Sequence, residues 1–132
     1  PTLLMHGDSL CTSDVSYQQF RNMVRGAPWQ DQFLAQSIGA RRAIAAQLRE
    51  KSESMNSMKA DDILDITPAE AQTQMEAAEV TRLIHGHTHR PARHPLVIRG
   101  APAERIVLGD WHDSAWCIKA DETGIELIEW KI

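Results

Sequence analysis

The sequence predicts an α/β fold, because two short apolar runs that each end in a histidine-bearing turn enclose a long helical stretch. Residues 2–5 (TLLM) form the first run and lead into a turn that begins HGD. Residues 80–84 (VTRLI) form the second run and lead into the sequence HGHTHRP. Buried strands that end at polar, glycine-containing loops and are separated by helices are typical of α/β proteins.

Composition fits one domain and excludes several classes of protein. The 132 residues are 42% hydrophobic and 24% charged, with a formal net charge of −4. No apolar run approaches the ~20 residues of a membrane-spanning helix. Cys11 and Cys117 lie far apart and form no C-x-x-C motif, which favours reduced thiols in a cytoplasmic protein. An acidic chain is poorly suited to nonspecific binding of nucleic acid.

The first helical segment begins near residue 14. Ser13 or Asp14 is a suitable N-cap, apolar residues then recur at helical spacing, and residues 26–28 (GAP) end the helix. Residues 33–51 form an amphipathic basic helix in which we expect a break near Gly39.

Helical patterning continues beyond this basic segment. Residues 52–59 are polar and compatible with a helix, and Pro68 is well placed in the first turn of a helix that is capped by Thr67 and runs to about Glu79. We therefore expect a contiguous helical insertion, or lid, at about residues 14–79.

Four β-like runs follow the second histidine turn. Glycines at positions 100, 109 and 124 separate them, which predicts an antiparallel meander. The expected strands are residues 95–99, 105–108, 115–119 and 125–130.

Three histidines at the two strand ends are the strongest candidates for chemistry. In an extended chain the side chains of residues i and i+2 point to the same side, so His87 and His89 could face one centre. If the two strands are neighbours, His6 joins them, and imidazole nitrogen is a common ligand of divalent metals. The alternative is that all three are loop histidines with ordinary hydrogen bonds. We favour that ordinary role for His85. We expect His94 and His112 to lie in loops, and no ligand spacing singles them out.

The motifs resemble a known family. Residues 83–91 (LIHGHTHRP) are similar to the G-H-x-H element of calcineurin-like metallophosphoesterases, and residues 5–8 (MHGD) are similar to their preceding histidine motif. Within that superfamily, essentially all 132 residues resemble the UDP-2,3-diacylglucosamine diphosphatase family of lipid A biosynthesis. The resemblance is carried by residues 3–14 with Tyr17 and Phe20, by residues 58–60 and 63–68, and by residues 105–111.

The resemblance implies a hydrolase. Water attacks the pyrophosphate of UDP-2,3-diacylglucosamine at a two-manganese centre, which releases UMP and 2,3-diacylglucosamine 1-phosphate (lipid X). His6, His87 and His89 match metal ligands of the family, and His87 also matches a substrate contact.

Four further residues match substrate contacts of the family: Asp14, Ser52, Asn56 and Lys59. On a continuous helix the last three would occupy one face, at positions i, i+4 and i+7. Each also has an ordinary alternative, since Asp14 could serve only as a helix cap and the other three could be solvated surface residues.

The basic segment at residues 33–51 resembles the helical lid of the family, which shelters acyl chains. Its simple alternative is a helix that packs on the core. An apolar face rimmed by arginines also suits an anionic membrane surface. From the resemblance we expect a cytoplasmic protein that is peripheral on the inner membrane.

The remaining metal ligands of the family come from D-x-H, G-D-x-x-[DE] and G-N-[HR]-D elements, which the resemblance places ahead of the first histidine motif. Only five residues precede His6, and they begin inside an apolar strand. We therefore expect the C-terminal half of a metallophosphoesterase sandwich with an inserted helical lid, inactive by itself. Other interpretations are a different metal-dependent nucleotide phosphodiesterase, or a noncatalytic module that binds metal or docks on a membrane.

Overall fold

The computed structural model describes residues 1–56, 59–60 and 63–132. Two compact units make up the chain. The sheet unit contains Pro1–Cys11 and Asp65–Ile132, and the helical unit contains Thr12–Leu64.

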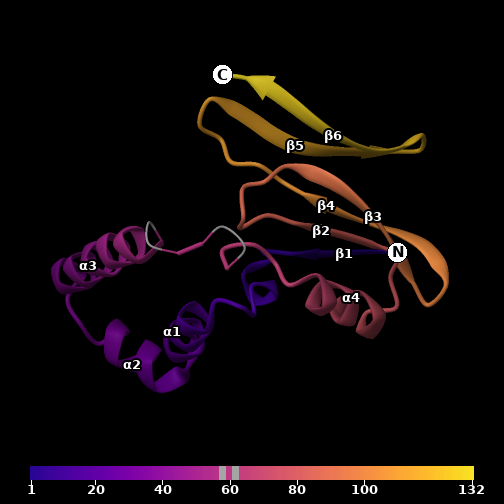
Figure 1. Cartoon of the computed structure of the whole chain (residues 1–132). Helices are drawn as coiled ribbons and strands as arrows, with labels where there is room; N and C mark the ends of the chain where they lie inside the picture. The colour runs from indigo at the N-terminus through magenta and orange to yellow at the C-terminus, as the bar shows by residue number, and fades with distance from the viewer. Residues whose placement is uncertain (57–58, 61–62) are drawn as a thin grey trace. The chain divides into compact units, whose positions relative to one another are not determined.

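β1 precedes all of the helices, and the other strands follow them in the sequence, as Figure 1 shows. In chain order they are β1 (Thr2–Met5), the 3-10 helix η1 (Asp8–Leu10), α1 (Val15–Arg25), α2 (Ala27–Leu34), α3 (Ile38–Asn56), α4 (Pro68–Ala77), β2 (Arg82–His85), β3 (Ala92–Ile98), β4 (Ala101–Val107), β5 (Ser114–Asp121) and β6 (Gly124–Lys131).

The main sheet has the strand order β1-β2-β4-β3. β1, β2 and β4 are parallel, whereas β3 is antiparallel to β4. In the first pair, Leu3 lies opposite Leu83 and Met5 lies opposite His85. The two strands that carry the histidine turns are therefore neighbours, and their carboxyl ends meet at one edge of the sheet.

The strands after residue 90 form two hairpins in two different sheets. β3 and β4 join the main sheet, and β5 and β6 form a separate two-stranded sheet. The expected single antiparallel meander is wrong, because β4 pairs in parallel with β2 on its other side. A period-two pattern fixes which residues are strand but not which neighbour a strand selects.

α4 packs in the sheet unit, against η1, β2 and β3. Met75 of this helix and Leu10 and Leu83 are fully buried in the same core. The helical unit consequently ends at Leu64, earlier than the expected limit at residue 79. The two chain segments that flank the inserted helices are joined within the sheet unit, where the Thr67 N–H donates to the Leu10 carbonyl at 2.8 Å.

The helical unit is built from α1, α2 and α3. Asp14 is the N-cap of α1, and its side chain accepts the Tyr17 N–H at 3.0 Å, which decides between the two candidate caps. The expected break in the basic segment occurs between Leu34 and Ile38, ahead of Gly39, which lies inside α3. In the described part of the chain, no helix combines the length and the apolar character needed to cross a membrane.

Truncation of the core residue Leu83 to alanine should lower the free energy of unfolding by about 3 kcal/mol, because it leaves a cavity under α4. The matched control is Leu4→Ala on the neighbouring strand β1, where the side chain is 69% exposed. Urea unfolding followed by circular dichroism measures both variants. An equal loss in the two variants would contradict the assigned core.

Candidate functional site

His6 and His87 come together at the end of the two parallel strands. β1 ends at Met5 and β2 ends at His85, and the His6 carbonyl accepts the Gly86 N–H at 3.0 Å just beyond them. The rings of His6 and His87 then lie 5.0 Å apart between centroids, at an angle of 63°. The sequence correctly predicts this proximity.

The turn that carries His87 and His89 is not an extended strand. His87 has a φ of 68° and His89 a φ of 52°, so both are in the left-handed region. The alternation argument for these two residues is therefore wrong, because it requires extended backbone. Left-handed conformations of non-glycine residues cost about 1–3 kcal/mol each and cluster at functional sites.

Carboxylates hold one ring nitrogen in two of the candidate ligands. His6 Nδ1 lies 3.2 Å from Oδ1 of the buried Asp8, and His89 Nδ1 lies 3.5 Å from Asp110 Oδ2. A carboxylate near one ring nitrogen favours the tautomer with the proton on that nitrogen, which leaves the other nitrogen able to bind a metal.

His85 differs, because both of its ring nitrogens are engaged. Nδ1 lies 2.9 Å from the Gly86 carbonyl, and Nε2 lies 3.0 Å from Arg105 Nη1. Burial lowers the pKa of His85, the hydrogen bond to Gly86 raises it, and the positive charge of Arg105 lowers it further. His85 is therefore neutral, donates from Nδ1 and accepts at Nε2.

Three candidate ligands do not converge on one point. Within the described ranges, no group of three or more His, Cys, Asp or Glu side chains is arranged to hold a metal ion. The structure pairs His6 with His87 and places His89 beside Asp110. The donor chemistry fits a divalent metal, since imidazoles with an unused nitrogen are suitable ligands, but the shell is incomplete.

Asp110 was not among the predicted site residues. A local signal was present, because residues 109–113 (GDWHD) match the pattern G-D-x-x-[DE] at a position after the histidines. Glycine is required at position 109 because a Cβ atom there would come within 2.4 Å of the Trp116 ring.

Two predicted substrate contacts meet in the helical unit. Lys59 Nζ donates to Asp14 Oδ2 at 2.6 Å, and the Asp14 side chain is only 8% exposed. Burial raises the pKa of Asp14, but the hydrogen bonds from Lys59, the Tyr17 N–H and the Ser16 hydroxyl outweigh it and lower the pKa below its usual value. Asp14 is thus both a helix cap and half of an ion pair.

A cavity of about 340 Å³ lies beside this ion pair in the same unit. Ser52 and Lys59 line it, together with an apolar wall. The wall includes Phe20, Met23, Leu48 and Met55. Such an arrangement suits a ligand with a hydrocarbon part and a polar part.

The expected row of three contacts on one helix face stays a prediction as a whole. Lys59 is not part of α3 (Ile38–Asn56), and it forms an ion pair with Asp14. The side chain of Asn56 is outside the described part of the structure.

Fold and site together define a mixed α/β protein that presents imidazoles at the end of a parallel strand pair. No family model matches the chain. The curated proteins that are similar to it include three relatives that are each named UDP-2,3-diacylglucosamine hydrolase. These identities make the chain a homologue of the UDP-2,3-diacylglucosamine hydrolases, which confirms the resemblance of its motifs.

The relative from Cellvibrio japonicus is 59% identical over 132 residues, which is 100% of this chain and 55% of the relative. The relative from Marinobacter nauticus is 49% identical over 122 residues, 92% of this chain and 50% of the relative. The relative from Pseudomonas aeruginosa is 48% identical over 126 residues, 94% of this chain and 52% of the relative. The chain spans about half the length of the curated relatives it matches.

Replacing Lys59 with methionine should raise the pKa of Asp14 and cost about 2 kcal/mol at neutral pH, because a buried carboxylate loses a charged donor. The folded-state pKa of Asp14 is depressed, so its contribution is present above the unfolded pKa and is lost as pH falls through the folded pKa. Denaturant unfolding at neutral and acidic pH should show the difference from wild type shrinking on acidification. Lys51→Met, at an exposed lysine of the same cavity, is the control. A pH-independent difference would exclude this role of the ion pair.

Replacing Asp110 with asparagine should weaken the preference of His89 for the tautomer with its proton on Nδ1. The ¹⁵N shifts of the imidazole should show a larger share of this tautomer in wild type than in the variant. His85 serves as the internal control, since its partners are Gly86 and Arg105. An unchanged His89 spectrum would show that Asp110 does not orient the ring.

Proposed function

We propose that this chain is the C-terminal part of a hydrolase that cleaves the pyrophosphate bond of UDP-2,3-diacylglucosamine. The products would be UMP and 2,3-diacylglucosamine 1-phosphate (lipid X), in lipid A biosynthesis. The observation that carries the proposal is the 59% identity over the whole chain to a relative named for hydrolysis of this substrate.

The histidine end of the sheet unit supports a metal centre in this hydrolase. His6, His87 and His89 would hold part of it, and their nitrogens suit Mn²⁺. Two bound Mn²⁺ ions would lower the pKa of an attacking water and neutralise charge on the phosphoryl oxygens. Three imidazoles do not fill the coordination shells of two cations, so we propose that the rest of the protein supplies the remaining ligands.

This chain's own residues prepare that site. Asp8 and Asp110 lie near Nδ1 of His6 and of His89 and would orient these rings, and the left-handed backbone of the second histidine turn sets the direction in which its side chains leave the chain. The orienting carboxylates remove the need to select a ring tautomer when a metal binds.

The cavity of the helical unit supports a lipid substrate. Each methylene group buried on its apolar wall would contribute about 0.8 kcal/mol. Ser52 and Lys59 are the polar groups that would meet sugar or phosphate oxygens at its edge. A ligand with acyl chains and an anionic head uses both features, whereas a plain nucleotide uses only the polar one.

The junction of α2 and α3 supports peripheral binding to the inner membrane from the cytoplasmic side. Leu34 is 59% exposed and Ile38 is 66% exposed, and the exposed Arg42 follows one turn later. Exposed apolar residues beside a cation suit an anionic lipid surface, where each basic residue contributes about 1 kcal/mol.

The proposal is tested with a chimera of this chain and the part of the Cellvibrio japonicus relative that lies outside the match. With Mn²⁺ it should release UMP from UDP-2,3-diacylglucosamine, and His87→Ala should lower the rate about 100-fold. Lys119→Gln on β5 is the matched control, since Lys119 pairs with Asp121 far along the chain from the histidine turns.

Three outcomes would contradict the proposal. Equal rates on a lipid-free UDP-sugar would indicate a general nucleotide phosphodiesterase. UMP release by this chain alone, at the rate of the chimera, would contradict the divided set of ligands. Stoichiometric metal binding by a chimera that hydrolyses neither substrate would indicate a noncatalytic module.

A further inference from the structure

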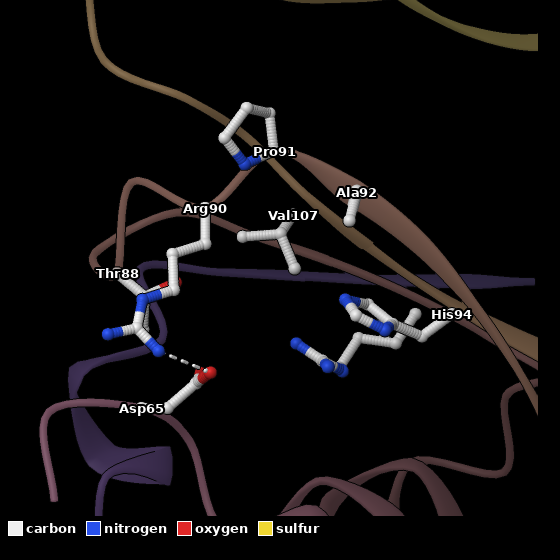
Figure 2. Close-up of a pocket in the computed structure, with 8 residues that line it drawn as sticks. Asp65, Thr88, Arg90, Pro91, Ala92, His94 and Val107 are labelled. Carbon is white, nitrogen blue, oxygen red and sulfur yellow. Dashed lines mark hydrogen bonds and ion pairs between the residues drawn. The ribbon is translucent and has the colours of Figure 1, made fainter. Parts of the chain in front are cut away.

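The sheet unit contains a second cavity, of about 260 Å³, which the proposed hydrolysis does not use (Figure 2). Its polar wall comes from the segment before α4, the second histidine turn and the β3–β4 hairpin. The polar residues are Asp65, Thr88, Arg90, His94 and Arg105. None of the three candidate metal-binding histidines is among its lining residues.

Arg105 brings an incompletely compensated positive charge to this cavity. It lies on β4 opposite His94 of β3 and is half-buried. The one hydrogen bond that its side chain makes with a described residue runs from Nη1 to the neutral ring of His85. Burial lowers the pKa of Arg105, and the negative charge of Asp65 opposes this. An anion in the cavity would supply the charge that this guanidinium lacks.

Thr88 adds an unused polar group to the same wall. Its Oγ1 is buried and has no hydrogen-bond partner among the described residues. A buried hydroxyl without a partner is unfavourable, and an anion that enters the cavity and displaces the atoms covering Oγ1 would satisfy it.

Asp65 does not repel an anion strongly, because both of its oxygens are engaged. Oδ1 accepts the Ile66 N–H at 2.7 Å, and Oδ2 accepts from Arg90 Nη1 at 3.0 Å, the contact dashed in Figure 2. Two guanidinium groups therefore face one carboxylate in the cavity wall, and the surplus charge is positive.

We propose that this cavity binds a tetrahedral oxyanion, either free phosphate or the terminal phosphate of a phosphomonoester. Arg105 and the Thr88 hydroxyl donate to it, and the imidazole of His94 lies beside it. The cavity is below the ~300–1,000 Å³ of typical small-molecule sites, so it fits a phosphate group with a few waters and not a whole nucleotide.

The test is an isothermal titration calorimetry experiment in which inorganic phosphate is added to the full chain at constant ionic strength. The wild-type chain should bind one phosphate. Arg105→Gln should weaken binding about tenfold, and Thr88→Val about fivefold. Arg99→Gln, at an exposed arginine of the same sheet unit, should bind like wild type.

Thr88→Val keeps the test valid if Arg105→Gln fails to fold, because Thr88 Oγ1 has no partner to lose. Methyl phosphate separates the two sources: binding equal to that of inorganic phosphate supports a phosphomonoester, and binding of inorganic phosphate alone supports the free ion. Absence of saturable binding, or equal affinity in wild type and Thr88→Val, would overturn the proposal. Neither result depends on hydrolase activity, so failure of the phosphate-binding proposal can be distinguished from failure of the proposed function.

Discussion

Parallel pairing of β1 with β2 is the constraint on which the histidine end of the sheet unit depends. The strands have four residues each, and their register places Met5 beside His85, so that His6 and His87 emerge side by side. Parallel strands require a long crossover, which the helical unit and α4 provide. Slippage by one residue would turn His6 to the opposite face of the sheet and separate the two rings.

Local patterns in the sequence predicted the strands, the helices and the proximity of His6 to His87. They failed where long-range pairing decides the structure. β4 joins β2 although its own pattern fits a simple meander, and α4 folds with the sheet although its helical pattern fits the inserted segment equally well. The left-handed backbone of His87 and His89 has only a weak signature in these residue types, since such conformations are normally adopted by glycine and only occasionally by histidine.

The ion pairs of the two sites show the same limit. Lys59 meets Asp14 across 45 residues of sequence, and its position comes from that contact, not from helical spacing. Asp110 reaches His89 from the loop after β4. Chemistry could be assigned to residue types that matched a motif, whereas the pairing of Lys59 with Asp14 and of Asp110 with His89 is seen only when distant segments are brought together.

The hydrogen bond from Thr67 to Leu10 ties together the two chain segments that flank the inserted helices. Both residues of this hydrogen bond belong to the sheet unit, so folding of the sheet unit depends little on the length or sequence of the inserted helices. The entropy cost of closing a loop also rises only slowly with loop length. The inserted helices can therefore diverge in sequence, or be exchanged as a unit, while the sheet is preserved. Ligand preference can then evolve separately from the scaffold that carries the histidines.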